Sequence, residues 1–369
     1  MNTGITAIGT ALPQYQRNQD EIGELISSIS NLTNEQKKTL RAVYRATGIK
    51  KRYSVLSDFC RSSGSFTFFP NDINASFPTT AQRMEIYKAN ALELALKAID
   101  DCMNQIGFDY SEITHLITVS CTGMYAPGID IEIVQKLKLN KATKRTTINF
   151  MGCYGAFNGI KVADAFSRTD PKAKVLVVCV ELCTIHFQRA ADLSNLISNA
   201  IFSDGAAAVI IEANPEGKLV LGLESFFCSL LPNSENDMAW HVGDQGFDMI
   251  LSSYIPALIK SGISTFAEQL LEKTKLAIFD IDYFAIHPGG QKILEACEIA
   301  LNISKEDNQF SYKVMQNYGN MSSATVLFVL KEIWNNLQRT DDGKTIFSCA
   351  FGPGLTLESI LLKVNNNYS

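Results

Sequence analysis

The segment Asn149-Phe-Met-Gly-Cys153-Tyr-Gly-Ala-Phe-Asn-Gly159 is the most informative part of this chain. It overlaps the β-branched run Thr146–Phe150 and leads into a helical stretch from Tyr154 to Phe166. The pattern therefore predicts a strand, a glycine-containing turn and a helix. Because a helix N-terminus favours an anion, we expect a lowered thiol pKa and a nucleophile at Cys153. The alternative is a small buried hydrophobic residue.

Two further segments place a polar side chain beside glycines at the boundary of an apolar run. His287 ends the run Tyr283–Ile286 and precedes Pro288-Gly-Gly, so its ring can face a cleft. Asn320 stands between Gly319 and Met321, ahead of an apolar helix. The alternatives are a hydrogen-bonded loop histidine and an asparagine that caps a helix.

A cysteine, a histidine and an asparagine that meet in one site suit carbon–carbon bond formation. The thiolate accepts an acyl group from a thioester. Decarboxylation of a malonyl thioester then develops an enolate oxygen, which an imidazole and an amide stabilise without being consumed. A thioesterase is the weaker alternative, because an asparagine supplies no base for water.

Strand-like and helical runs alternate along the chain, which predicts a mixed α/β fold. The predicted strands are Ile113–Val119, Thr146–Phe150, Lys174–Cys179, Ala206–Ile211, Tyr283–Ile286, Thr345–Cys349 and Thr356–Leu362. The predicted helices are Met84–Gln105, Tyr154–Phe166 and Ser322–Asn336. A similar order of strand, glycine turn, polar residue and helix occurs twice. It predicts a duplicated unit with halves 1–215 and 216–369 and a seam near Asn214–Gly217.

The bulk composition excludes several classes of protein. The 369 residues, 46% of them hydrophobic, are enough for a large core, and the net charge of −5 disfavours a nucleic-acid binder. No apolar run reaches the length of a membrane span, and the N-terminal residues lack the pattern of a signal peptide. The nine cysteines form no CxxC pair and no metal-ligand cluster, so we expect reduced thiols in a cytoplasmic protein without a metal site.

From Ile5-Thr-Ala-Ile-Gly-Thr-Ala-Leu-Pro13 to Gly354-Leu-Thr-Leu-Glu358, the chain resembles the type III polyketide synthases, the chalcone synthase-like family. The motifs that carry the resemblance are Gly152-Cys153-Tyr, Ile201-Phe202-Ser-Asp-Gly-Ala-Ala-Ala208, His287-Pro-Gly-Gly, Tyr318-Gly-Asn-Met-Ser-Ser-Ala324 and Phe351-Gly-Pro-Gly-Leu-Thr356. The resemblance implies an αβαβα thiolase fold with a duplicated five-layer core. It also implies a homodimer, acyl-CoA and malonyl-CoA as substrates, and no metal or organic cofactor.

The resemblance also assigns roles to single positions. Cys153, His287 and Asn320 match the catalytic residues, and Phe202 matches an aromatic gatekeeper whose alternative is a core residue. The other positions that match the substrate cavity are Met249, Cys121, Cys183, His186, Trp240, Ser322 and Pro353. The positions that match a CoA-binding rim are Arg41, Arg45, Lys50, Lys51 and Arg52, with Gly289 and Gly290 beside His287; a basic run is otherwise a solvated face.

Departures from the family pattern bear on product size. Met249 replaces a phenylalanine common in plant members, and Trp240 stands where glycine is common. If Trp240 points inward, it narrows the cavity and shortens the product. The alternative is that its side chain faces the dimer interface or the solvent side. His186 stands where threonine is common and is either a proton donor or a satisfied core residue. Ala126, where methionine is common, opens its wall for an alkyl chain.

The sequence therefore predicts an enzyme that loads an acyl-CoA starter on Cys153 and extends it with malonyl-CoA to a pyrone, a resorcinol or a short β-keto product. One alternative is a single-round ketosynthase that makes a diketide, with an acyl-carrier protein as donor. Another is a non-catalytic acyl-binding subunit, although such subunits tend to lose the nucleophile. We expect no nucleic-acid partner and no insertion into a membrane.

Overall fold

The computed structural model describes residues 2–30, 32–190, 192–215 and 219–366. Its centre is a nine-stranded mixed sheet in the order β11-β12-β13-β8-β1-β7-β6-β4-β5. The strands are β1 (Thr3–Ala11), β4 (His115–Ser120), β5 (Lys144–Asn149), β6 (Lys174–Leu182), β7 (Asp204–Ala213), β8 (Leu219–Leu230), β11 (Tyr283–Ile286), β12 (Thr345–Gly352) and β13 (Thr356–Asn366). Every predicted strand is present. The central strands β1 and β8 were not among the predictions.

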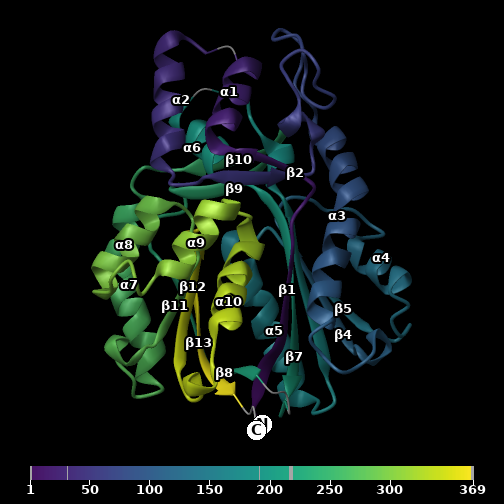
Figure 1. The fold of residues 1–369 in the computed structure, drawn as a ribbon, viewed down its shortest axis with the longest axis vertical. Helices are drawn as coiled ribbons and strands as arrows, with labels where there is room; N and C mark the ends of the chain where they lie inside the picture. The colour runs from purple at the N-terminus through teal and green to yellow at the C-terminus, as the bar shows by residue number, and fades with distance from the viewer. Residues whose placement is uncertain (1, 31, 191, 216–218, 367–369) are drawn as a thin grey trace.

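The sheet has two arms, and helices cover them in five layers (Figure 1). Helices α5 (Gly155–Thr169) and α10 (Thr325–Asn336) lie between the arms. Helices α3 (Thr80–Met103) and α4 (Ile129–Lys136) cover the outside of one arm, while α7 (Ile255–Glu272) and α8 (Gln291–Leu301) cover the outside of the other. Three buried apolar clusters correspond to this layering. The predicted αβαβα architecture is therefore confirmed.

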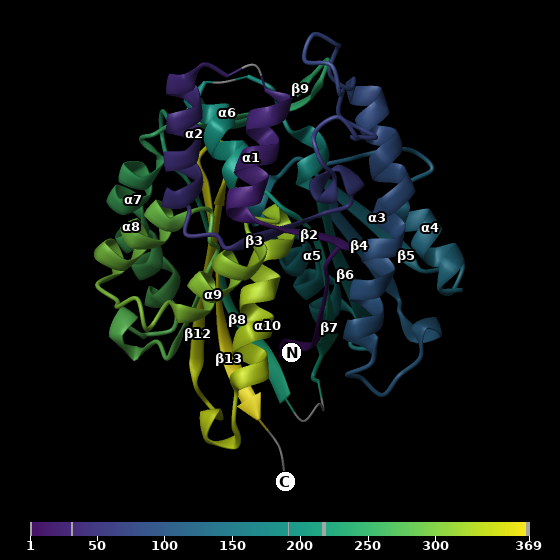
Figure 2. The same cartoon turned by 45° about the horizontal axis from the view of Figure 1, so that its top comes forward.

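A cap of helices and short strands lies at one end of the sheet (Figures 1 and 2). It consists of α1 (Gln19–Ile29), α2 (Asn34–Ala46), α6 (Leu193–Ile201), the β2–β3 pair (Tyr15–Asn18 and Lys51–Ser54) and the β9–β10 hairpin (Met238–Gly243 and Gly246–Leu251). Helix α9 (Gln309–Tyr318) leads from the C-terminal half towards this end. The candidate site residues lie beneath the cap.

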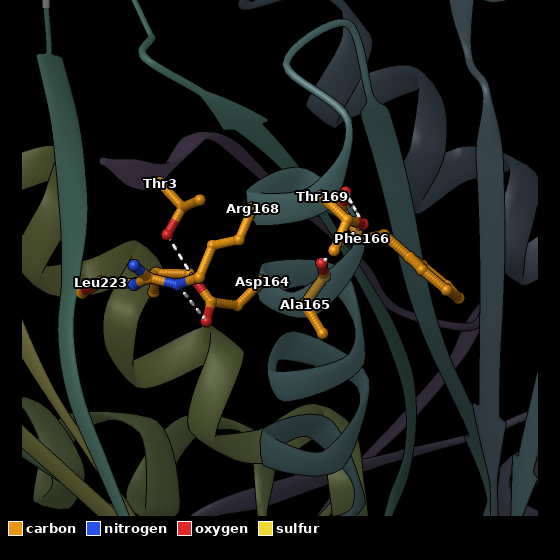
Figure 3. Close-up of polar contacts among 7 residues, drawn as sticks. All are labelled: Thr3, Asp164, Ala165, Phe166, Arg168, Thr169 and Leu223. Carbon is orange, nitrogen blue, oxygen red and sulfur yellow. Dashed lines mark hydrogen bonds and ion pairs between the residues drawn. The ribbon is translucent and has the colours of Figure 1, made fainter. Parts of the chain in front are cut away.

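Helix α5 begins directly after the turn that carries Cys153, and its far end is fixed to two strands (Figure 3). The Asp164 carboxylate accepts hydrogen bonds from the Thr3 hydroxyl on β1 and from the Arg168 Nε, the latter at 2.8 Å. The Arg168 guanidinium also donates to the carbonyl of Leu223 on β8 at 3.4 Å. One end of the helix is thus held by charge-assisted bonds while the other presents the thiol.

The division into two halves stays a prediction. Asn214 adopts a left-handed conformation after β7, and its N–H donates to the Asn2 carbonyl. Glu216 and Gly217 of the expected seam lie outside the described residues. Within the described residues, no helix combines the length and the apolar character needed to span a bilayer.

Candidate active site

Cys153 lies in a single 3₁₀ turn, Gly152–Tyr154, between β5 and α5. The turn requires a glycine at 152, because its φ is +80° and a Cβ there would overlap the Pro353 ring. Cys153 is partly buried, and its sulfur lies 3.9 Å from the Asn320 amide oxygen. The strand–turn–helix prediction is confirmed, and two of the three expected site residues meet.

Asn320 is held through both its backbone and its side chain. Its N–H donates to the Ile201 carbonyl and its carbonyl accepts from the Ser203 N–H, each at 2.9 Å, so that it forms a β-bridge with Phe202. The side-chain oxygen accepts the Ser322 N–H at 2.9 Å and the Thr325 hydroxyl at 3.3 Å. These bonds fix the amide orientation and leave Nδ2 without a protein acceptor among the described residues.

His287 follows β11 at the same end of the sheet. Its N–H donates to the Cys349 carbonyl at 2.8 Å, which places it beside the last residues of β12. Those residues continue to Pro353, which abuts the Gly152 turn. The imidazole is 1% exposed, and neither ring nitrogen has a partner among the described residues. An unpaired buried imidazole at the same end of the sheet as a nucleophile is a group that a substrate can satisfy.

The expected lowering of the thiol pKa was wrong. Burial raises the pKa of Cys153 to about 12, although hydrogen bonds involving Ser322 and Asn320 act in the opposite direction. Burial also lowers the pKa of His287 to about 3, so that its imidazole is neutral at pH 7. The turn therefore positions the thiol without ionising it, because desolvation outweighs the helix N-terminus.

A buried carboxylate that the sequence analysis missed lies in the same region. Glu181, at the end of β6, accepts hydrogen bonds from the Cys121 N–H, the Thr122 hydroxyl and the Ser323 hydroxyl. Burial raises its pKa, and its charge raises the pKa of Cys153. A glutamate after an apolar run was the signal available, but the predicted strand ended at Cys179, before this residue.

Two small adjoining cavities occupy the site. The cavity at Cys153 has a volume of about 20 Å³ and the second about 40 Å³. Every predicted substrate-cavity residue except His186 lines the first: Phe202, Met249, Cys121, Cys183, Trp240, Ser322 and Pro353. Four of these also line the second, together with His186: Cys183, Phe202, Trp240 and Met249. The four shared residues therefore form the wall between the cavities, while their roles as substrate contacts stay predictions.

Trp240 and His186 are both fixed by hydrogen bonds. The indole N–H of Trp240 donates to the Cys121 carbonyl at 2.7 Å, and the ring borders both cavities. His186 Nε2 donates to the Thr122 carbonyl at 2.7 Å, and its Nδ1 accepts the Phe247 N–H at 3.0 Å. Of the two alternatives, Trp240 is thus inward and His186 is a satisfied buried residue.

The expected CoA-binding positions divide into two groups. Arg45 and Lys50 are exposed on the cap and Lys51 is half-buried, and their role in binding CoA stays a prediction. Arg52 is 2% exposed, so its expected place on that rim was wrong. The reason is that its guanidinium binds backbone carbonyls at the end of α6 inside the cap.

The remaining two predictions concern small residues. A Cβ at Gly289 would lie 3.0 Å from the Ile293 Cδ1 and 3.8 Å from the His287 Nε2, so space there is tight, whereas a Cβ at Gly290 would meet no atom within 4 Å. Their role in CoA binding stays a prediction. Ala126 does not line either cavity at the site. It borders a separate hollow of about 330 Å³ between β4 and α4, which contradicts its expected place in the cavity wall.

Comparisons with known proteins agree with this geometry. The chain matches the family model "Chalcone and stilbene synthases, N-terminal domain" over residues 2–215 and the corresponding C-terminal domain model over 223–365. It is 31% identical to the mycobacterial "Alpha-pyrone synthesis polyketide synthase-like Pks18" of Mycobacterium tuberculosis, over 98% of this chain and 91% of that protein. It is 32% identical to "Probable polyketide synthase 1" of Dictyostelium discoideum, of whose length it spans only 11%.

Solved structures give the same result. The brown-algal PKS-I of Ectocarpus siliculosus superposes with a TM-score of 0.92 at 30% identity, and each chain is covered to 98%. The C-terminal type III domain of Steely1, a type I/III hybrid from Dictyostelium, superposes with a TM-score of 0.90 at 29% identity, covering 99% of this chain and 100% of that one. With its fold, the Cys153 turn and both family models in agreement, this chain belongs to the chalcone and stilbene synthase family, the type III polyketide synthases.

Proposed function

We propose that Cys153 accepts an acyl group from an acyl-CoA starter and that the enzyme extends it by decarboxylative condensation with malonyl-CoA. The observation that carries this proposal is the meeting of a partly buried thiol with an oriented amide at 3.9 Å, and the unpaired imidazole of His287 at the same end of the sheet supports it. Family membership supports the reaction class, a condensing acyltransferase. The starter and the cyclisation are set by the cavity of this chain.

Loading begins from a neutral thiol and a neutral imidazole. Because burial raises the pKa of Cys153 and lowers that of His287, no thiolate–imidazolium pair exists before the reaction, and we assign the thiol proton to the imidazole only as sulfur attacks the thioester carbonyl. The tetrahedral oxyanion is stabilised by amide and imidazole donors. Its collapse expels the CoA thiolate, which takes the proton, and leaves an acyl-Cys153 thioester.

Extension uses the same two groups on a second substrate. Malonyl-CoA loses carbon dioxide, and the electron pair of the broken bond forms an enolate on the remaining thioester. The Asn320 Nδ2 and an N–H of His287 donate to that oxygen, which lowers the barrier without a change in their protonation. The enolate carbon attacks the acyl carbonyl on Cys153, a carbon–carbon bond forms, and the thiolate leaves.

The size of the cavities supports a short product. A volume of about 20 Å³ at Cys153 accommodates little more than one water molecule. Trp240 and Met249 separate this space from the next, so a growing chain meets a wall after few extensions. Both cavities are smaller than a pyrone or a resorcinol, so product formation requires the wall between them to move, and one relative carries alpha-pyrone synthesis in its name.

The decisive experiment compares Cys153→Ala with the wild type on malonyl-CoA and a panel of acyl-CoA starters. We expect no condensed product from the variant and pyrones or related polyketides from the wild type, identified by mass spectrometry. Cys297→Ala is the matched control, because Cys297 is a buried thiol away from both cavities. Condensation by Cys153→Ala at the wild-type rate would refute the proposal, and a diketide alone would indicate a single-round ketosynthase.

The proposed chemistry needs neither a metal ion nor an organic cofactor. The thioester activates the acyl group, and decarboxylation itself supplies the carbanion. Dialysis against a chelator should therefore leave the rate of product formation unchanged. A loss that is restored by a divalent cation would contradict this part of the proposal.

We also propose a homodimer that forms along β5. This strand is at the edge of the sheet, and its residues are exposed or half-buried. An edge with open backbone groups pairs readily with a second copy across a two-fold axis. Sedimentation of the purified protein at several concentrations should give the mass of two chains, whereas a monomer at micromolar concentration would refute the dimer.

The last two parts of the proposal concern the acyl donor and the location of the enzyme in the cell. Arg45, Lys50 and Lys51 lie on the cap where CoA phosphates would bind, and replacing them with alanine should raise the KM for acyl-CoA. Parallel assays with acyl-CoA and acyl-carrier-protein donors distinguish the two sources. Nine free cysteines are consistent with a cytoplasmic location, which fractionation of the source cells tests.

A further inference from the structure

The end of helix α6 is held by groups from three distant parts of the chain. Its last residues lead into Phe202, and four successive carbonyls there each accept a hydrogen bond from outside the helix. The Ile201 carbonyl accepts from the backbone of Asn320, as described above, and the Ala200 carbonyl accepts from the Gln19 side chain at 2.7 Å. Arg52 donates to the other two, the carbonyls of Asn199 and Phe202, and the Tyr44 hydroxyl also donates to Asn199 at 2.9 Å.

Arg52 extends from β3 into the cap. Its Nε and one of its terminal nitrogens donate hydrogen bonds to different acceptors. One terminal nitrogen donates to the Asn199 carbonyl at 2.8 Å and to the Phe202 carbonyl at 2.6 Å. Its Nε donates to the Gln19 side-chain oxygen at 2.8 Å. The guanidinium carbon lies 5.5 Å from the centre of the Tyr44 ring. A cation at this place also complements the negative end of the helix.

The carbonyl that Arg52 binds belongs to the residue that bridges to the catalytic amide. Phe202 lines both cavities, and its neighbours Ile201 and Ser203 exchange backbone hydrogen bonds with Asn320. Arg52, Phe202 and Asn320 therefore form one continuous hydrogen-bonded unit. A displacement of the α6 end would move the aromatic wall and the amide together.

We propose that Arg52 is a positioning residue, which sets Phe202 and, through the β-bridge, the Asn320 amide for the condensation step. The inference rests on the proposed function. A lysine cannot reproduce these contacts, because one ammonium group cannot occupy both the place of the terminal nitrogen that binds two carbonyls and the place of Nε that binds Gln19. The charge of Arg52 is thus less important than its geometry.

The test compares Arg52→Lys with the matched control Arg83→Lys. Arg83 is likewise fully buried, stacks near a ring (Phe77) and donates to three backbone carbonyls, but these belong to Pro78, Ile185 and Phe187. Hydrogen exchange of the amides in segments 199–204 and 318–322 reports on the bridge without any need for catalysis. We expect exchange there to be about tenfold faster in Arg52→Lys and unchanged in Arg83→Lys.

The second measurement is the number of malonyl-CoA molecules decarboxylated for each unit incorporated into product. This ratio is independent of the fraction of folded enzyme, so a purely structural defect leaves it unchanged. We expect it to rise about tenfold in Arg52→Lys, because a misplaced enolate is protonated before it reaches the acyl group. Arg83→Lys should keep the wild-type ratio.

The outcomes are separable. If Arg52→Lys does not fold, Gln19→Leu removes the Nε acceptor and the bond to Ala200, and it should shift both measurements in the same direction. Wild-type exchange in a folded variant, an unchanged ratio, or equal shifts in Arg83→Lys would each overturn the proposal. Condensation by Cys153→Ala would refute the proposed function instead, and the exchange measurement would still decide whether Arg52 holds the bridge.

Discussion

At Cys153 two physical effects act on one thiol in opposite directions. The helix that follows favours a thiolate through its free N–H groups, whereas burial favours the neutral thiol. Burial prevails and raises the pKa to about 12. The nearby carboxylate of Glu181 adds to the same direction. Activation of the nucleophile therefore requires a proton acceptor during the reaction, and we assign that role to His287, whose ring nitrogens have no partner among the described residues.

This environment predicts a steep pH dependence for alkylation of Cys153. The thiolate fraction grows about tenfold per pH unit well below the pKa, so the rate with iodoacetamide should rise by about that factor from pH 7 to 8 and again to 9. Peptide mass spectrometry separates Cys153 from the other thiols, with the exposed Cys60 as internal reference. A flat profile over this range would show a preformed thiolate–imidazolium pair.

Trp240 is expected to limit the product length. Trp240→Gly removes the ring that borders both cavities and should give longer products or allow longer starters, measured by mass spectrometry. It should also lower the free energy of unfolding by about 3 kcal/mol through lost packing. Trp334→Ala is the control, since this second tryptophan packs on the central core. Unchanged products from a folded Trp240→Gly would contradict the assignment.

Residue types and their order predicted the catalytic candidates, but not how deeply each side chain is buried or how burial shifts its pKa. Gly152, Cys153 and Asn320 could be found because each lies in a short segment of glycines and polar residues at the edge of an apolar run. The burial of Arg52 could not be predicted, since four basic neighbours suggest a solvated surface and only the folded cap surrounds this one side chain. The thiol pKa was wrong for the same reason: burial is a property of the fold.

At the scale of the element, the Gly152–Tyr154 turn joins an edge strand to a central helix. The far end of that helix is anchored through Asp164 to β1 and, by way of Arg168, to β8 (Figure 3). The near end depends on Gly152, whose φ of +80° lies in the left-handed region that residues with a side chain rarely adopt. The nucleophile is thus placed by a glycine that adopts this conformation without strain and by a helix whose far end is hydrogen-bonded to two strands.

Gly152→Ala should therefore reduce condensation by about a hundredfold or more, because it displaces the thiol by a fraction of an ångström or farther. It combines a positive φ with an overlap on Pro353. Gly343→Ala is the control, because Gly343 has φ +83° and its added methyl group would meet no atom within 4 Å. Initial rates of the two variants separate steric displacement from backbone strain. Equal losses would contradict the steric explanation.

Short β-branched runs with clear ends were predicted at nearly their observed positions, as β4, β6 and β11 show. β1 and β8 were missed because glycines interrupt their apolar residues, and burial on both faces of β1 and of the first half of β8 removes the alternation that marks a strand. The β9–β10 hairpin was missed as well, although it carries Trp240 and Met249. Its half-exposed residues show no strong pattern.

At the scale of the whole molecule, buried neutral histidines link stability to pH. Burial lowers the pKa of His186 and His287 to about 3, against about 6.5 in an unfolded chain. Their contribution to stability is therefore complete above pH 6.5 and is lost as the pH falls towards 3. Glu181 has a raised pKa, so its contribution to stability is lost as the pH rises rather than as it falls. The effect of the histidines must therefore be measured as the difference between the wild type and a histidine variant.

His186→Gln provides that difference, because an amide can donate to the Thr122 carbonyl and accept the Phe247 N–H as the imidazole does. Between pH 6 and 4, the free energy of unfolding of the wild type should fall more steeply than that of the variant, by about 1.4 kcal/mol per pH unit. Urea unfolding at four pH values measures the slopes. Parallel slopes would show that His186 is protonated equally in both states.

The order of strands in the sheet has a consequence for biosynthesis. β13 is translated after every other described strand of the sheet, and it lies between β12 and β8, whose other edge meets β1. A nascent chain therefore exposes an unpaired strand edge on the ribosome until Asn366 has emerged, and such edges recruit chaperones or other chains. A stop codon placed before Thr356 should thus yield an aggregating product, rather than a smaller folded enzyme.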